Sequence, residues 1–530
     1  MVRKVVVRKN RYLDSVFLMA VARRIASQPG IRDASALMAT EANRGVLAGM
    51  GYGEADAEVA AAGPNDLLLA LEGEPAAVEA LAAEADSWLS RDGSGAPAGE
   101  GAAGAPHSIA DAVAIRPDAS VAVISVPGAH AAREARAALR QGLHAFLFSS
   151  NVSVEDERSL KLEARQRRLI LMGPDCGTAW LAGAGIGFAN AVRRGPIGVV
   201  GSTGTGMQEF ACLVHRAGAG ISHGIGTGSR DLWDGIGGIS TLAAIEALEA
   251  DPGTKVIAVL AKPPGTATAA LLLERLRRCT KTVILCLLGD EPTPAPDLGE
   301  PGRVRPATTI DEAVGHALAA AGVEPPGFLG RDPSWNETIR TELARMRPEQ
   351  RYVRGLFAGG TLCYQSQAIF RRSGLLVHSN SPLHGMRQLA DDDPSREDTL
   401  VDMGAERFVQ GRPHPMIDAT LRRNRLEHEA RDPTVALILL DFILGAIASA
   451  DPVGDMLDAI RGARQAASRR GGHLCVVTSV CGTDQDVQGL EGQARTLVEA
   501  GALVFPSNAQ AAEFCREVRL QLAVRKEVGR

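Results

Sequence analysis

The fold is decided by the stretch IGVVGSTGTGMQEFACLVHRAG, residues 197–218 of a chain of 530 residues. Its first residues, Ile197–Val200, are apolar and partly β-branched, as in a strand that is buried in a parallel sheet. A glycine-rich turn follows at Gly201–Gly206, and the spacing of the next apolar residues predicts a helix. Strand, glycine turn and helix in this order indicate an α/β protein with parallel sheets.

A second stretch repeats this pattern, GLFAGGTLCYQSQAIFRRSG at residues 355–374. Each stretch is followed by another glycine-containing loop, GIGTGSRDLWDG (224–235) or VDMGAERFVQGRPHP (401–415). Each then continues into a related strand segment, EADPGTKVIAVLA (249–261) or EARDPTVALILLD (429–441). The repeat predicts two related flavodoxin-like domains.

Short apolar runs alternate with helical stretches along the rest of the chain, which predicts helices on both faces of the sheets. We expect a Rossmann-like domain over residues 1–193, a first flavodoxin-like domain over 194–322 and a second over 352–530. A proline-containing linker would join the last two, over 323–351, and the Gly/Ala/Pro-rich residues 91–107 would form a mobile insertion. The other clear strand candidates are Val121–Val126, Ala145–Phe148, Leu169–Met172, Thr282–Leu287, Leu474–Thr478 and Ala502–Phe505.

Charge and composition exclude several classes of protein. Lysine and arginine total 57 against 62 acidic residues, and aromatic residues are 4%, which argues against a nucleic-acid binder. The most apolar run, Val435–Ala450, is interrupted by Asp441 and Gly445 and is too short to cross a membrane. The eight cysteines form no CxxC pair and the chain has no zinc signature. We therefore expect a cytoplasmic protein that holds no metal.

The glycine turn after Val200 is the sharpest candidate site. Glycines let backbone amides approach a ligand closely, and a helix N-terminus favours an anion. The turn is not a Walker A loop, because Met207 stands where the lysine would be. The alternative is a tight turn without a ligand. The predicted phosphate-binding residues are Gly201, Ser202, Thr203, Gly204, Thr205 and Gly206.

The matching turn of the second copy is Ala358-Gly359-Gly360-Thr361, which has fewer hydroxyl donors. By itself this turn suits an anion site or a simple turn equally. The repeat favours the anion site, because two helix N-termini aimed at one phosphate would stabilise it without a lysine. Gly359, Gly360 and Thr361 are therefore added to the predicted phosphate site.

Three residues are candidates for catalysis. His414 lies between Pro413 and Pro415 and could accept a phosphoryl group or relay a proton; the alternative is a surface or capping histidine. Arg412, two residues earlier, could bind phosphate or carboxylate as a bidentate donor, or be merely solvated. Arg230 occupies a comparable loop in the first copy and, like Arg412, is a candidate for orienting the carboxylate of a substrate.

Residues at strand ends of the N-terminal part are candidates for binding a cofactor, because open α/β sheets bind ligands at this edge. Asn10 lies in a basic turn that lacks glycines, so a solvated charge run is the competing interpretation. Cys176 has no visible base beside it in the sequence and is expected to be a buried structural thiol. The predicted cofactor-binding residues are Asn10, Pro127, Gly128, Ser149, Asn151, Pro174 and Asp175.

These motifs resemble known enzymes. GPDCGTA (173–179), GVVGSTGTG (198–206) and EADPGTKVIAVLA are similar to the succinyl-CoA synthetase α subunit. AGGTLCYQSQAIF (358–370), VDMG (401–404) and EARDPTVALILLD are similar to the C-terminal domain of its β subunit. The whole arrangement resembles the FdrA family of acyl-CoA-synthetase-like proteins, over nearly the full length.

The resemblance implies a CoA-binding-type Rossmann-like domain followed by two ligase domains. In the synthetases one helix N-terminus from each ligase domain binds the phosphate of a phosphohistidine, and Gly201–Gly206 and Gly359–Thr361 are the matching positions. The chain departs from that pattern in three ways. Residues 287–306 contain no histidine where the synthetases carry the phosphorylated one. RKNRYLDS (8–15) replaces the glycine-rich CoA loop, and the ATP-grasp half of the β subunit is missing.

FdrA-type proteins resemble subunits of an oxamate carbamoyltransferase of purine-ureide (allantoin) degradation, which works with companion proteins. The resemblance therefore implies an oligomeric enzyme subunit with phosphate or carbamoyl phosphate as ligand. An acyl-CoA ligase component is the alternative, with His414 as relay and CoA against Pro127–Ala129 and Ser149–Asn151. A non-catalytic scaffold that senses CoA or an anion is the third interpretation.

Overall fold

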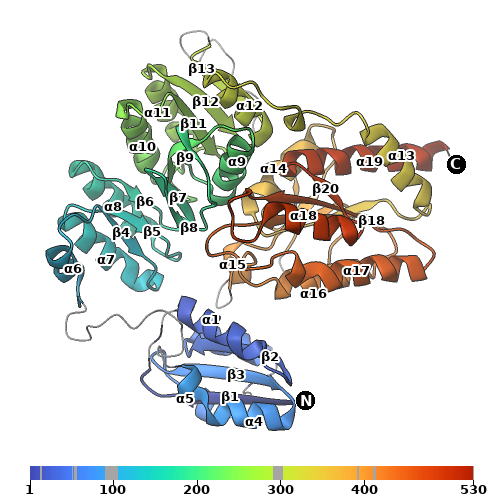
Figure 1. The fold of residues 1–530 in the computed structure, drawn as a ribbon, viewed down its shortest axis with the longest axis horizontal. Helices are drawn as coiled ribbons and strands as arrows, with labels where there is room; N and C mark the ends of the chain where they lie inside the picture. Colours follow the sequence, from blue (N-terminus) through green and yellow to red (C-terminus); the bar gives the residue numbers. More distant parts are fainter. Residues whose placement is uncertain are drawn as a thin grey trace. The chain divides into compact units, whose positions relative to one another are not determined.

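The computed structural model describes residues 1–11, 13, 15–49, 52, 57–89, 106–289, 302–390, 393–409 and 413–528 (Figure 1). The chain forms two compact units. The first consists of Met1–Ala105 with Glu406–Pro413, and the second of Pro106–Ala405 with His414–Arg530. Most of the predicted insertion at 91–107 lies outside the described residues.

The first unit contains a three-stranded antiparallel sheet, so the prediction of a Rossmann-like fold from residue 1 was wrong for this part. The strands are β1 (Val2–Arg8), β2 (Ile31–Met38) and β3 (Leu67–Gly73), in the order β1-β3-β2. The crossover from β1 to β2 leaves a gap between them, and β3 fills it antiparallel to both, buried along its whole length. The helices of this unit are α1 (Ser15–Ala26), α2 (Glu41–Gly49), α3 (Ala57–Ala60), α4 (Pro75–Ala83), α5 (Ala85–Trp88) and α15 (Glu406–Val409).

The second unit begins with a small Rossmann-like layer, parallel as predicted. Its strands β4 (Val121–Ile124), β5 (His144–Leu147) and β6 (Leu171–Met172) pair in the order β4-β5-β6. Ser153 caps the helix after β5 by accepting a hydrogen bond from the backbone N–H of Asp156. The helices of this layer are α6 (Ile109–Ile115), α7 (Gly128–Arg140) and α8 (Val154–Gln166).

A seven-stranded sheet follows, in the order β13-β12-β11-β9-β10-β7-β8. Five of its strands are parallel, whereas β7 and β8 form an antiparallel hairpin at one edge, so the sheet is mixed. Its strands are β7 (Thr178–Leu181), β8 (Ala184–Gly187), β9 (Arg194–Gly201), β10 (Ile221–Gly226), β11 (Val256–Ala261), β12 (Thr282–Leu287) and β13 (Val304–Ala307). Its helices are α9 (Gly204–Arg216), α10 (Ile239–Ala250), α11 (Thr266–Arg277) and α12 (Ile310–Ala320).

The second seven-stranded sheet has the order β16-β15-β17-β14-β18-β19-β20, and all of its pairings are parallel. The connection predicted over 323–351 contains η3 (Gly327–Leu329) and α13 (Trp335–Arg345), and Trp335 packs edge-on against Phe505 and Phe514. The strands are β14 (Tyr352–Phe357), β15 (His378–Ser379), β16 (Arg387–Gln388), β17 (Thr399–Asp402), β18 (Val435–Ile443), β19 (Cys475–Cys481) and β20 (Leu503–Phe505). The helices are α14 (Gly360–Arg371), α16 (Thr420–Glu429), α17 (Gly454–Arg469), α18 (Leu490–Glu499) and α19 (Asn508–Val528).

In both large sheets the strand before the glycine turn lies where the strand order reverses. β9 has β10 on one side and β11 on the other, and β14 lies between β17 and β18. Ligands of open α/β sheets bind beyond the carboxyl ends of the strands at such a switch point. The fold therefore places both glycine turns at positions suited to a ligand.

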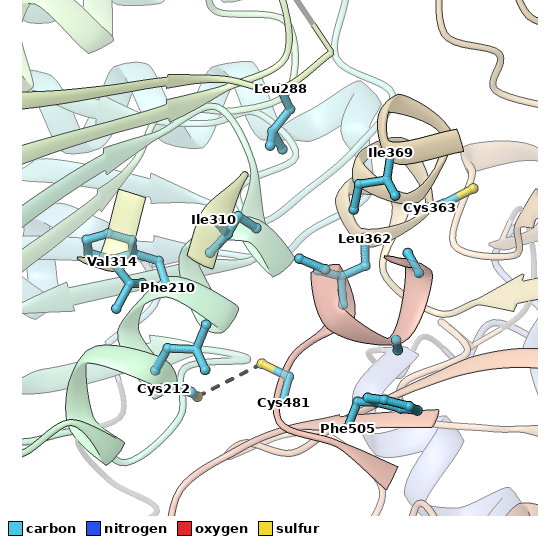
Figure 2. Packing of buried hydrophobic residues seen from close by; sticks show 14 of the residues in the cluster. Phe210, Cys212, Leu288, Ile310, Val314, Leu362, Cys363, Ile369, Cys481 and Phe505 are labelled. Atoms are coloured by element: carbon cyan, nitrogen blue, oxygen red, sulfur yellow. Dashed lines mark hydrogen bonds between the residues drawn. The ribbon is translucent and has the colours of Figure 1, made fainter. Parts of the chain in front are cut away.

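The two large sheets share one hydrophobic core, which fixes α9 relative to α14. Phe210 and Cys212 of α9 lie opposite Leu362 of α14 and Cys481 of β19 in a single cluster (Figure 2). Burying one Leu or Phe side chain stabilises a fold by about 1.5–3 kcal/mol, so a continuous cluster holds the two domains firmly. Within the described ranges, no helix is both long and apolar enough to span a membrane.

Candidate active site

The first glycine turn leads directly into α9. Thr203 is the N-cap of this helix, and its Oγ1 accepts a hydrogen bond from the backbone N–H of Gly206 at 3.2 Å. The backbone N–H of Ser202 donates to the carbonyl oxygen of Leu260 on the neighbouring strand β11. A Cβ added at Gly201 would lie 2.6 Å from Cγ of Met207, so a larger residue there would force this buried side chain to move. The first backbone N–H groups of α9 have no acceptor within the helix. They directly follow this closely packed turn.

Thr178 lies beside this turn and was missed by the sequence analysis, although it stands in the GPDCGTA motif. Its side chain is 1% exposed, and its Oγ1 has no hydrogen-bond partner in the described part of the chain. The same oxygen lies 3.7 Å from where a Cβ on Gly204 would sit, which places it at the start of α9. A buried hydroxyl without a partner costs about 1–3 kcal/mol. This hydroxyl is therefore a donor available to a group bound at the helix N-terminus.

Two backbone N–H groups of the second glycine turn already donate hydrogen bonds to a carboxylate of the chain itself. The backbone N–H groups of Ala358 and Gly359 donate to Oδ1 and Oδ2 of Asp441, each at 2.7 Å. Nη2 of Arg422 donates to Oδ1 of the same carboxylate at 3.0 Å, and both side chains are buried. Burial raises the pKa of Asp441, and the charge of Arg422 opposes that rise. Two amides at this turn therefore already bind an internal anion.

The two turns converge, as the sequence predicts, and they touch. The hydroxyls of Thr203 and Thr361 are hydrogen-bonded to each other. A Cβ at Gly206 would lie 2.9 Å from Cγ2 of Thr361, and one at Gly359 would lie 3.1 Å from Cβ of Thr205. A phosphate held between the two helix N-termini would therefore require Thr203 and Thr361 to separate.

Asp402, at the end of β17, is the titratable group beside the start of α14. Its Oδ1 accepts from the backbone N–H of Gly404 at 3.0 Å, and its Oδ2 faces the position of a Cβ on Gly360. Burial raises the pKa of Asp402 to about 6, against the charge of Lys262, which lowers it. Both protonation states of this carboxyl group are therefore accessible near neutral pH. The VDMG motif contained this residue, but its depth in the fold was not visible in the sequence.

His414 lies in the same region, with its ring against that of Phe188 at a centroid distance of 5.6 Å. Burial, and then the charge of Arg422, lower the pKa of His414 to about 4, so the imidazole is neutral at pH 7. Nδ1 accepts the backbone N–H of Met416 at 3.2 Å, which assigns the proton to Nε2. In this tautomer His414 is a hydrogen-bond donor at Nε2. Arg412, the other candidate of this loop, lies outside the described residues.

Arg230 is engaged in an ion-pair network instead of facing the glycine turns with a free guanidinium. Its Nε donates to Glu157 at 3.0 Å, and its Nη2 donates to the carbonyl oxygen of Val152 at 2.7 Å. Glu157 also accepts from the fully buried Lys161, whose Nζ contacts Asp231 at 2.7 Å. This network links α8 to the loop after β10, and it occupies Nε and Nη2 of Arg230, the residue predicted to orient a substrate.

Most of the predicted cofactor residues come together at the carboxyl edge of the Rossmann-like layer. A side chain at Gly128 would collide with the carbonyl oxygens of Ser150 and Asn151, so the two loops approach closely. Ser149 Oγ donates to the carbonyl oxygen of Val126, and its own carbonyl accepts from the N–H of Asp175 at 3.0 Å. Pro127 is the N-cap of α7, Asn151 has a positive φ of 59°, and Pro174 follows a cis peptide bond.

Asn10 lies in the first unit, in a turn that is held together by a carboxylate. Its backbone N–H donates to Oδ1 of Asp66 at 2.8 Å, and Nζ of Lys9 donates to Oδ2 at 2.9 Å. These hydrogen bonds lower the pKa of Asp66 to about 2. Cys176 is buried, as expected, and burial raises the pKa of its thiol to about 12, which makes it a poor nucleophile.

Comparison with known proteins agrees with this architecture. Residues 1–106 match the family described as AllF, heavy metal-associated domain, and residues 356–518 match the CoA-ligase family. The uncharacterized protein YahF of Escherichia coli K12 is 41% identical over 517 residues, which cover 97% of this chain and 98% of YahF. This chain belongs to the YahF family. Within that family it combines an AllF-type N-terminal domain with a succinyl-CoA synthetase-like CoA-ligase part.

More distant relatives match parts of this YahF-family chain. The α subunit of the ADP-forming succinate–CoA ligase of Methanothermobacter thermautotrophicus is 26% identical over 211 residues, 39% of this chain and 70% of that subunit. The solved dinucleotide-forming acetyl-coenzyme A synthetase 1 of Ca. Korarchaeum cryptofilum is 15% identical, with a TM-score of 0.28, and the match covers 77% of this chain and 85% of the synthetase chain.

The N-terminal family match raises the question of a heavy-metal site, and the residues of the YahF-family chain do not fit one. Soft metal ions are bound by thiolate, thioether and imidazole ligands, and of these residue types the first 106 residues contain only four methionines. Residues 1–106 contain neither cysteine nor histidine; the first of each in the chain are Cys176 and His107. In the portion that the structure describes, no group of three or more His, Cys, Asp or Glu side chains is arranged to hold a metal ion.

Proposed function

We propose that this YahF-family chain is a subunit of a phosphate-dependent carbamoyl or acyl transferase, specifically an oxamate carbamoyltransferase. The proposal rests on the arrangement of groups at the start of α9, which we call the phosphate seat. There the N-terminus of α9, with Thr203 as its N-cap, lies beside Thr178 Oγ1, which has no hydrogen-bond partner among the described residues, at a switch point of the sheet. Such a seat suits an anion such as phosphate. Phosphate or carbamoyl phosphate is the proposed ligand, and CoA remains a candidate cofactor.

The proposed reaction moves a carbamoyl group from oxalurate to phosphate. An oxygen of hydrogen phosphate attacks the carbamoyl carbon, and the bond from that carbon to the oxamate nitrogen breaks. The proton of hydrogen phosphate passes to the leaving nitrogen, which gives oxamate and carbamoyl phosphate. The reaction consumes no ATP and needs no phosphohistidine.

The residues of the site have separate parts in this proposal. The α9 N-terminus and Thr178 would hold the phosphate, and the helix amides would stabilise negative charge as it develops on oxygen. Asp402, with a pKa of about 6, would carry the proton toward the leaving nitrogen. His414 would donate a hydrogen bond from Nε2. Arg412 remains a proposed carboxylate or phosphate ligand, and Arg230 would act by holding its loop through Glu157.

An acyl-CoA ligase component is the second candidate. The CoA-ligase match over residues 356–518 and the clustering of Gly128, Ser149 and Asp175 favour it. In that case CoA would lie against these loops and a partner subunit would supply ATP chemistry. His414 would then have to release the Nε2 proton to accept a phosphoryl group. A scaffold that only senses CoA or an anion is the third candidate.

The test uses the chain isolated from its native cells with the proteins that co-purify with it. The complex is incubated with oxalurate and phosphate, and separately with radiolabelled ATP. Phosphate-dependent formation of oxamate and carbamoyl phosphate supports the proposal. Acid-labile label on the chain, without oxalurate breakdown, supports the ligase. If neither occurs while phosphate or CoA still binds, the chain is a scaffold and the proposed activity is rejected. We expect a cytoplasmic hetero-oligomer.

A further inference from the structure

We propose that Lys262 binds the carboxylate of the small substrate at this site, and this rests on the proposed function. Lys262 follows directly on β11, whose last residue is Ala261. β11 pairs with β9, and Leu260 lies opposite Gly201, the first residue of the glycine turn. Lys262 therefore flanks the α9 N-terminus at the carboxyl edge of the sheet, on the other side of the turn from β10 and β7.

The ammonium group of Lys262 is held in place but is not neutralised. Nζ lies 5.0 Å from the ring centroid of Tyr364, which belongs to α14 of the other large sheet. Among the residues that the structure describes, Nζ has no carboxylate within ion-pair distance and no hydrogen-bond acceptor. Lys161, by contrast, uses Nζ in contacts with Glu157, Thr227 and Asp231. A half-buried ammonium group with an aromatic neighbour and no anion is suited to an anionic ligand.

The charges around Lys262 define which anion fits. Its positive charge acts on Asp402 and lowers the pKa of that carboxyl group, although the two side chains form no ion pair. Asp441 lies on the same side, so the neighbourhood already contains two carboxylates. A monoanion beside Lys262 is repelled less by these groups than a dianion would be. The arrangement favours a carboxylate at Lys262 over a second phosphate.

Lys262 and Asp402 together also match the two groups of the proposed substrate, its carboxylate and its amide. Oxalurate and oxamate carry a carboxylate next to an amide. Lys262 would donate to the carboxylate, and Asp402 would accept from an amide N–H. Lys262 thereby takes the part that the sequence analysis assigned to Arg230, whose guanidinium is engaged by Glu157 and Val152. Phosphate would remain at the α9 N-terminus, on the side of Thr178.

The test measures protection of Lys262 from acetylation. The full chain is treated with a water-soluble N-hydroxysuccinimide acetate, alone or with saturating oxamate, succinate or inorganic phosphate, and the modified lysines are quantified by mass spectrometry. We expect oxamate to slow acetylation of Lys262 at least tenfold and phosphate alone to slow it less than threefold. Lys255, exposed at the opposite end of β11, is the internal control and should react at one rate throughout.

The outcomes separate this inference from the proposed function. Protection by succinate but not by oxamate would reject the carbamoyltransferase and retain Lys262 as a carboxylate ligand. No protection by either acid would overturn the inference, whatever activity the complex shows. Calorimetric titration of oxamate into Lys262→Met should also show at least a tenfold weaker Kd, with Lys255→Met unchanged. An equal Kd in Lys262→Met and the unmodified chain would overturn the inference as well.

Discussion

The two glycine turns have the same order of strand, turn and helix, but the charged side chains beside them differ in sign. The first, before α9, is flanked by Lys262 and by the hydroxyl of Thr178, which has no hydrogen-bond partner among the residues that the structure describes. The second, before α14, has its amides bound to Asp441 and has Asp402 beside it. A helix N-terminus attracts an anion in both cases, but the amides that lead into the second helix are bound by Asp441, whereas in the described part of the chain no internal carboxylate accepts from the amides of the first turn. A duplicated turn can thus become a binding site in one copy and a structural support in the other.

Removing the internal anion should have the largest effect. Asp441→Ala leaves the buried Arg422 without its counter-charge and two backbone amides without an acceptor. Breaking a buried ion pair in this way destabilises a protein by about 3–5 kcal/mol. We expect a large fall in the midpoint of urea denaturation, measured by circular dichroism. Asp458→Ala, on the exposed side of α17, is the control; equal midpoints in the two variants would show that Asp441 does not support the second turn.

Filling the first turn should abolish catalysis while the fold remains. A Cβ on Gly204 meets only Thr178 Oγ1, at 3.7 Å, so Gly204→Leu would place a side chain in the proposed phosphate seat without a backbone clash. We expect phosphate-dependent turnover by the complex to fall about 100-fold, a size typical of losing charge stabilisation on oxygen. Gly315→Leu on α12, where a Cβ also has open space, should keep full activity. Full turnover in Gly204→Leu would show that phosphate does not bind at this turn.

Thr178 should show opposite effects on stability and on binding. Thr178→Val replaces a buried hydroxyl, without a hydrogen-bond partner in the described ranges, by a methyl group of similar size, so the ligand-free chain should gain about 1 kcal/mol. The same change removes a donor to phosphate, and we expect the Kd for phosphate to rise about tenfold. Thr178→Ser, which keeps the hydroxyl, is the matched control for binding. Unchanged phosphate affinity in the valine variant would mean that this hydroxyl does not face the ligand.

The sequence predicted the repeated strand, turn and helix and the convergence of the two turns, because glycine patterns and apolar runs are local signals. It did not predict that Thr203 and Thr361 would touch, or that Asp441 would fill the second turn, since both depend on how the two sheets pack. The antiparallel first unit was missed because a short apolar strand such as Val5–Val7 does not encode the direction of its partner. Lys262 was missed because an unpaired lysine is visible only when its neighbours are known.

The smallest expected effect is on the pH dependence of stability, and it concerns the sixth residue of α9 and of α14. This residue has a carboxyl group in α9 and an amide group in α14. Glu209 of α9 accepts the backbone N–H of Asn508 at 2.8 Å, and Gln365 of α14 donates to Oδ1 of the same Asn508 at 3.0 Å. Burial raises the pKa of Glu209 to about 7, with a further contribution from Asp311, whereas the N–H of Asn508 opposes the rise. Glu209→Gln therefore gives the first helix the uncharged group of the second.

The sign of the pH effect follows from that pKa. Between the ordinary glutamate pKa and about 7, the folded chain holds a proton on Glu209 that the unfolded chain has already released. Stability from this group is therefore lost as pH rises through about 7. Between pH 6 and pH 8 the loss is about 1 kcal/mol. Urea midpoints of Glu209→Gln should fall less over this interval than those of the unmodified chain, and those of Gln365→Glu should fall more. Parallel pH profiles in all three proteins would mean that Glu209 is solvated, and that the first helix is not more sensitive to pH than the second.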